Sequence, residues 1–177
     1  MGRLIHALGG RSVRSSAAET EPVITIGVTA SGEALIRGAI TIQAPTERVW
    51  SIVDSSDVEI KKRLAPALVE IKWPDKLDRK NQVGARHSAV FQQPSGRVEV
   101  EYVTTRYEPN KLLSRTTSAR SVLLTEETFE LIECGRATEL NVGLTKRASK
   151  AALESFNLPT AEMVAEWLRR LKTEVER

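Results

Sequence analysis

The stretch ITIQAPTERVWSIV, residues 40–53, changes its hydrophobic period from two to helical spacing within a few positions. Ile40 and Ile42 alternate with polar neighbours, which is typical of a strand with one buried face. Pro45 follows, and proline suits the first turn of a helix because no amide partner is needed there. An apolar stripe at helical spacing comes next, formed by Val49, Trp50 and Val53. The stretch therefore predicts a strand that passes directly into a helix.

The flanks of this stretch extend the same pattern. On its N-terminal side, residues 22–43 predict extended chain with a turn at Ser31-Gly32. On its C-terminal side, residues 56–65 predict a second short helix that ends before Pro66. The acids of this helix lie near its start and its bases near its end, an order that complements the helix dipole. Those bases are Lys61, Lys62 and Arg63.

The middle of the chain predicts a series of hairpins. Turn sequences such as Pro94-Ser95-Gly96 and Glu108-Pro109-Asn110 separate runs of β-branched and alternating residues. Consecutive hairpins imply an antiparallel meander. We expect its strands at residues 68–73, 83–93, 97–106, 112–118, 122–133 and 138–146.

An amphipathic helix is expected at the C-terminal end, starting near Leu158-Pro159-Thr160. Residues 149–156 are a candidate for a separate helical turn before it. Apolar residues recur at spacings of three and four, and we expect Trp167 and Leu171 to be buried against the sheet. The apolar set is Met163, Val164, Trp167, Leu168, Leu171 and Val175.

Composition indicates one domain of residues 21–177, preceded by a flexible basic tail of residues 1–20. The tail contains a glycine pair, and its three arginines, Arg3, Arg11 and Arg14, account for the whole net charge of +3. The neutral body argues against nucleic-acid binding. No apolar run approaches the ~20 residues of a transmembrane helix. We expect a cytoplasmic protein; an organellar transit segment is the alternative, since the tail is rich in Arg and Ser.

Cysteine and histidine usage limits the chemistry of the chain. The single cysteine, Cys134, excludes an internal disulfide and a multi-thiolate zinc site. The two histidines are His6, in the tail, and His87. A two-histidine metal site within the domain is thereby excluded. No glycine-rich phosphate loop or nucleophile motif is found, so we expect no metal and no cofactor, and the catalytic residues, if any, are unknown.

The order of elements is now a strand, two short helices, an antiparallel meander and one amphipathic helix. With ITIQAPTERVWSIV, Gly84, Tyr107-Glu108-Pro109 and the closing WLRRLKTEVE in sequence, residues 35–177 resemble the START-like, Bet v 1-like (SRPBCC) superfamily, in particular its polyketide cyclase/dehydrase and lipid-transport group. The resemblance implies an α+β helix-grip fold. In that fold a curved antiparallel sheet wraps around a long C-terminal helix, two short helices close one end, and a cavity lies between.

Strand alternation nominates polar residues that share a face with apolar ones. We expect His87, Phe91, Tyr102, Arg115 and Glu127 to face the cavity, with Trp73 at its mouth and Trp167 on the helix. Two alternatives stay open. Arg115 and Glu127 could pair with each other, or lie outside if the register slips by one residue. His87 and Trp167 could serve packing alone, as a hydrogen-bonded wall residue and a core residue respectively.

Three functions fit these expectations. The first is binding or transport of a small hydrophobic molecule (lipid, polyketide-like or aromatic), by a monomer or homodimer. The alternative is an aromatase/cyclase-type enzyme in which His87, Tyr102, Arg115 or Glu127 guides proton transfer inside the cavity. A regulatory or stress protein of the same fold is the third possibility, although the sequence contains no recognisable partner motif.

Overall fold

A computed structural model describes residues 21–74, 82–120, 122–147 and 159–177. Eight strands form a single antiparallel sheet in the order β1-β2-β8-β7-β6-β5-β4-β3. The strands are β1 (Val23–Val28), β2 (Ala34–Ile42), β3 (Leu68–Lys72), β4 (Arg86–Gln93), β5 (Gly96–Glu108), β6 (Leu112–Ala119), β7 (Val122–Cys134) and β8 (Ala137–Lys146). The described helices are α1 (Thr46–Val53), α2 (Val58–Leu64) and α4 (Ala161–Glu176).

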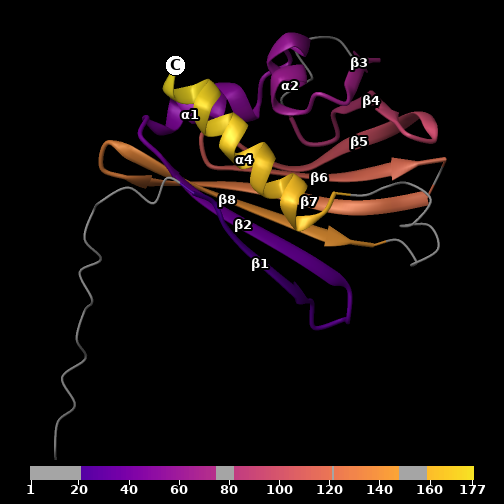
Figure 1. The fold of residues 1–177 in the computed structure, drawn as a ribbon, viewed down its shortest axis with the longest axis horizontal. Helices are drawn as coiled ribbons and strands as arrows, with labels where there is room; N and C mark the ends of the chain where they lie inside the picture. Colours follow the sequence, from indigo (N-terminus) through magenta and orange to yellow (C-terminus); the bar gives the residue numbers. More distant parts are fainter. Residues whose placement is uncertain (1–20, 75–81, 121, 148–158) are drawn as a thin grey trace, which may run out of the picture.

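The three helices all lie on one side of this sheet. Figure 1 shows α4 crossing the face of the sheet, with α1 and α2 grouped near the C-terminal end of α4. The predicted α+β, helix-grip fold is confirmed. The tail of residues 1–20 and the candidate turn at residues 149–156 lie outside the described residues and stay predictions.

Two of the three described helices, α2 and α4, begin at a residue whose side chain caps their first amides. Asp57 caps α2, its carboxylate accepting hydrogen bonds from the amides of Glu59 at 2.8 Å and Ile60 at 3.4 Å. Thr160 caps α4, its hydroxyl accepting from the amide of Met163 at 3.2 Å. The described helices and predicted helical ranges agree to within two residues.

The largest difference from the predicted strands is at the start of β4, which begins at Arg86 instead of residue 83. Strand β5 runs on to Glu108 instead of ending at residue 106. A register shift between Thr104 and Arg106 interrupts its pairing with β6. Such a bulge bends a strand and re-aims the side chains beyond it. Beyond this one, Tyr107 reaches the carboxylate of Asp54, next to α1, with its hydroxyl 2.8 Å from Oδ2.

The core lies where α4 packs against the β2–β8 region of the sheet. Leu168 and Leu171 are fully buried, and Ile42 and Leu140 meet them from the strands. Burial of Leu171 is as expected. Trp167 is only partly buried, because its side chain also lines a cavity. None of the described helices is both long and apolar enough to span a membrane.

Close approach of α4 to the sheet depends on Gly38 in β2. A β-carbon added there would lie 2.7 Å from Leu168 Cδ1, 3.0 Å from Ile24 Cδ1 and 3.2 Å from Val164 Cγ1. Leu168 has no exposed surface, so its side chain has little room to move aside. Gly143 on the neighbouring strand β8 differs, since its nearest neighbour would be Thr128 Cβ at 4.0 Å.

This difference predicts opposite responses to a single methyl group. Gly38→Ala should lower the free energy of unfolding by about 1–3 kcal/mol, as overpacked cores do. Gly143→Ala is the matched control, and should be neutral or slightly stabilising because alanine has fewer unfolded conformations than glycine. Urea unfolding of both variants measures the two changes. Equal stability of the two variants would show that α4 does not rest on Gly38.

Candidate functional site

A cavity of about 620 Å³ lies between the sheet, α4 and the two short helices. Sites for small molecules commonly have volumes of roughly 300–1,000 Å³. Most of the wall is apolar. Its apolar side chains come from every layer around the cavity and include Leu64, Leu68, Ile71, Ala89, Phe91, Leu113, Phe129, Val142, Leu144 and Val164.

A line of flat side chains crosses the cavity wall from β3 toward α4. His87 stacks on Tyr102 with ring centroids 4.7 Å apart and planes 2° from parallel. On its other side His87 stacks on Trp73, which follows β3, at 4.3 Å. The stack follows from sheet register, since His87 and Tyr102 are directly paired residues of β4 and β5. The stack therefore brings to one wall aromatic side chains from separate parts of the sequence.

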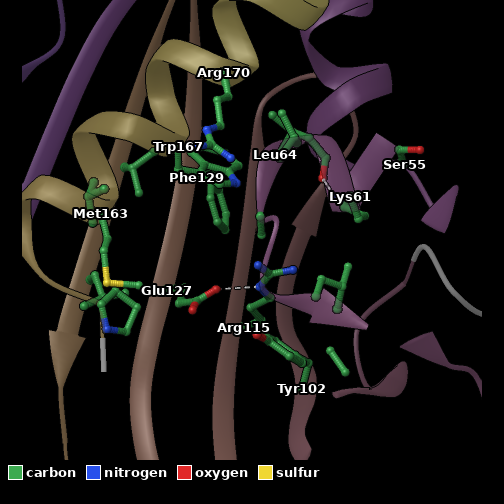
Figure 2. Close-up of a pocket in the computed structure, with 18 of the residues that line it drawn as sticks. Ser55, Lys61, Leu64, Tyr102, Arg115, Glu127, Phe129, Met163, Trp167 and Arg170 are labelled. Carbon is green, nitrogen blue, oxygen red and sulfur yellow. Dashed lines mark hydrogen bonds and ion pairs between the residues drawn. The ribbon is translucent and has the colours of Figure 1, made fainter. Parts of the chain in front are cut away.

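Arg115 continues this line toward the helix. Its guanidinium carbon lies 4.6 Å from the centre of the Tyr102 ring and 5.1 Å from that of Phe129. Phe129 in turn contacts Trp167 of α4, with centroids 5.5 Å apart and planes inclined at 52°. Figure 2 shows Tyr102, Arg115, Phe129 and Trp167 gathered in this one pocket.

The Arg115–Glu127 ion pair is the main polar feature of this wall. Arg115 Nε donates to Glu127 Oε2 at 2.7 Å, and the two residues are directly opposite each other on β6 and β7 (Figure 2). Their side chains are only 19% and 12% exposed. Burial lowers the pKa of Arg115, but Glu127, Tyr102 and Asp54 together more than reverse this, so the guanidinium stays charged. Burial, and then Glu127, raises the pKa of the Tyr102 phenol well above its ordinary value.

Lys61 enters the same cavity from α2. Its Nζ donates to the main-chain carbonyl of Val53 at 2.7 Å. Burial lowers the Lys61 pKa to about 7, and Arg115 shifts it in the same direction, while Asp54 and Glu127 oppose the shift. A buried amine loses its proton easily because the interior solvates the charged form poorly.

Asp54 also lines the cavity and acts electrostatically on Lys61, while Tyr107 bonds Asp54 from outside the lining. Burial raises the pKa of Asp54, although the hydrogen bond from Tyr107 and the charges of Lys61 and Arg115 hold it back. Burial and the bond to Asp54 raise the pKa of Tyr107 to about 12, which keeps the phenol protonated as the donor.

All seven residues nominated from the sequence lie on the cavity wall, namely Trp73, His87, Phe91, Tyr102, Arg115, Glu127 and Trp167. Arg115 and Glu127 form the pair that was one of the open alternatives. The ligand-binding role of all seven stays a prediction.

Sequence reasoning missed Lys61 and Asp54, which also line the cavity. Lys61 was interpreted through the helix dipole alone. One signal for its inward direction was present: Lys61 lies three residues from both Val58 and Leu64, so it shares their side of the helix.

The sequence and the fold were both compared with those of known proteins. No family model and no curated protein matches the sequence. Among solved structures, a START superfamily protein from Mycobacterium smegmatis is 14% identical, with a TM-score of 0.61 over 82% of this chain and 98% of that one. Ara h 8.0201 is 10% identical, also with a TM-score of 0.61, over 82% of this chain and 99% of that one. The chain has the START-like, Bet v 1-like fold.

A protein from Rhodobacter sphaeroides has the same START-like architecture at 18% identity, with a TM-score of 0.64 over 87% of this chain and 98% of that one. Identities this low establish the fold and leave function to the site itself. In this START-like domain the polar groups meet at the end of the cavity that α1 and α2 approach. Its function must be argued from Asp54, Lys61, Tyr102, Arg115 and Glu127.

The ion pair predicts a strongly coupled response to mutation. Arg115→Met or Glu127→Leu alone should each lower the free energy of unfolding by about 3–5 kcal/mol, because the remaining charge is buried without its partner. The double variant removes both charges, so its free energy of unfolding should fall by much less than the sum of the two single decreases. Lys111→Met, in the exposed Lys111–Glu108 pair with its 2.9 Å separation, is the control and should cost under about 1 kcal/mol. Additive losses would mean that the pair is solvated.

Proposed function

We propose that this protein binds and carries a small, uncharged, predominantly apolar molecule between its sheet and α4. The observation that carries the proposal is the cavity of about 620 Å³ with apolar walls and a polar end. A ligand losing roughly 300 Å² of apolar surface gains about 7 kcal/mol before the cost of association. Micromolar binding requires about 8.2 kcal/mol after that cost, so hydrogen bonds and aromatic contacts inside the cavity must add to the gain from apolar burial.

Charge balance supports a neutral ligand. Glu127 already holds Arg115 inside the cavity, and burial disfavours the charged forms of both Asp54 and Lys61. On the α4 side, the acids and bases of the lining occur in equal numbers, as Glu162, Glu166, Arg169 and Arg170. An acid or an amine entering the cavity would upset this balance, at the cost of desolvating its charge. A carbonyl or hydroxyl group forms hydrogen bonds there without that cost.

Aromatic side chains in the lining support a flat or conjugated ligand. The rings of His87 and Tyr102 stack nearly parallel to each other, and Trp73 and Trp167 lie at opposite ends of the line. Offset or tilted contacts between aromatic groups add about 0.5–1.5 kcal/mol beyond the area they bury. Polyketide-like and aromatic molecules fit this wall better than a simple saturated chain.

The experiment compares 2-naphthalenemethanol with 2-naphthoic acid by thermal shift and calorimetry. The alcohol should raise the melting temperature and the acid should do so much less, since the two share a ring system and differ in charge. His87→Ala should weaken binding of the alcohol about 2–10-fold, by removing one stacking face. Arg97→Ala, an exposed residue on β5 outside the cavity lining, is the control and should leave affinity unchanged. Absence of any shift with neutral aromatic compounds would contradict the carrier function.

Convergence of polar groups supports a second candidate, an aromatase/cyclase-type enzyme. Such an enzyme needs at least two polar groups that reach a folded substrate from different directions. Tyr102 on β5, the Arg115–Glu127 pair on β6 and β7, and Lys61 on α2 line one cavity. Turnover of a poly-β-keto substrate that is lost in Arg115→Met/Glu127→Leu would favour this candidate. Binding without turnover would favour the carrier.

A further inference from the structure

The amine of Lys61 is held in the protein by a main-chain carbonyl and not by an ion pair. The lysine next to it, Lys62, has its Nζ 3.0 Å from Glu59 on the surface of α2. Lys61 Nζ instead lies inside the protein, where the bonded partner is the Val53 carbonyl at 2.7 Å. A neutral amine keeps this bond through one N–H. Its nitrogen lone pair is then available to a molecule in the cavity.

Burial is the main cause of the low pKa of Lys61, and the charged groups around it act in both directions. Asp54 beside α1, Arg115 on β6 and Glu127 on β7 act on it electrostatically. Tyr102 on β5, His87 on β4 and Arg170 on α4 line the same cavity, and β3 contributes the apolar side chains of Leu68 and Ile71. Burial outweighs the attraction of the two carboxylates and lowers the Lys61 pKa to about 7. About half of the molecules therefore hold a free amine at neutral pH.

We propose that Lys61 captures the carbonyl group of an apolar aldehyde or ketone as a reversible imine inside the cavity. The proposal rests on the proposed function, because the carbonyl compound must first occupy the apolar cavity. It narrows the ligand class to neutral molecules with a reactive carbonyl. Desolvated lysines in hydrophobic pockets are activated toward this chemistry, while surface lysines are held protonated.

The reaction balances with groups that this site provides. The lone pair of Lys61 Nζ forms a bond to the carbonyl carbon, and the carbonyl oxygen takes up a proton, giving a carbinolamine. The carbon–oxygen bond then breaks as this hydroxyl takes a second proton and leaves as water. The nitrogen, having lost both of its protons, is left doubly bonded to carbon. No oxidant or reductant is consumed.

Asp54 is placed to move these protons. Its carboxyl lines the cavity, interacts electrostatically with Lys61, and accepts a hydrogen bond from Tyr107. Burial raises its pKa toward the range in which a carboxyl group both gives and takes a proton. The hydrogen bond from Tyr107 fixes the carboxyl in position, so Tyr107 is a positioning residue.

Reductive trapping tests the proposal. The full chain is incubated with 2-naphthaldehyde and sodium cyanoborohydride, together with N-acetyl-lysine methylamide as a free amine in the same tube. Peptide mapping by mass spectrometry should place one reduced naphthylmethyl group on Lys61. Labelling there should exceed labelling of the free amine at equal concentration by about tenfold or more at pH 7, because the free lysine amine has a pKa of about 10.4.

The pH profile separates capture by a neutral amine from simple proximity. Below a pH of about 7, the unprotonated fraction of both amines rises about tenfold per pH unit. The ratio of Lys61 labelling to free-amine labelling is therefore constant in this range. Above it, Lys61 is already neutral while the free amine keeps deprotonating, and the ratio should fall by about tenfold per pH unit. Both amines react in the same tube, so the ratio of their labelling does not depend on how the reactivity of cyanoborohydride changes with pH. A ratio that does not change with pH would overturn the proposal.

Variants and a competitor complete the design. Lys61→Met and Lys61→Arg should both lose the adduct. The arginine variant keeps a long cationic side chain, so it still tests the proposal if Lys61→Met does not fold. Lys62→Met should keep it. 2-Naphthalenemethanol should slow labelling of Lys61 only. If the alcohol binds but Lys61 is labelled no faster than the free amine, the imine is wrong and the carrier function stands. If neither compound binds, both are wrong.

Discussion

The placement of α4 on one half of the sheet determines the rest of this structure. The helix packs mainly on β1 and β2, and Gly38 is the residue that lets Leu168 and Val164 come close to the strand. A helix about 10 Å wide that rests on one side of a broad sheet does not cover the other side. Strands β4 to β7 then face α4 across a space that α1 and α2 close at one end (Figure 1). The cavity is therefore a consequence of where the helix touches the sheet, and a core glycine fixes that contact.

Ionisable groups inside such a cavity must be compensated, and sheet register does most of this. Directly opposed positions on β6 and β7 bring Arg115 to Glu127, and directly opposed positions on β4 and β5 stack His87 on Tyr102. Antiparallel pairing holds these side chains in place without a dedicated loop, since the backbone hydrogen bonds already fix the strands. Lys61 has no such opposed partner. Its helix is short, its amine bonds a main-chain carbonyl, and its charge is the one that burial removes most easily.

Part of the cavity wall could be predicted from the sequence because strands have a period of two. Once His87 and Phe91 are placed on one face, and Arg115 on another strand, the alternation leaves few choices for where they point. The bulge at Thr104/Arg106 and the inward turn of Lys61 could not be found in this way. A bulge depends on how two strands fit over their whole length. The direction of a lysine on a seven-residue helix depends on how that helix docks. Both are tertiary effects that override local pattern.

Carrier and enzyme are not sharply separated at a site of this kind. A neutral amine held beside a carboxyl group lowers the barrier to imine formation, yet the imine by itself only retains the ligand. Turnover would require a second step, in which another group removes a proton from the carbon next to the captured carbonyl. Glu127 is the carboxylate across the cavity, but its Oε2 already accepts a hydrogen bond from Arg115 Nε at 2.7 Å. With this carboxylate already in an ion pair, the site favours holding a carbonyl compound over transforming it.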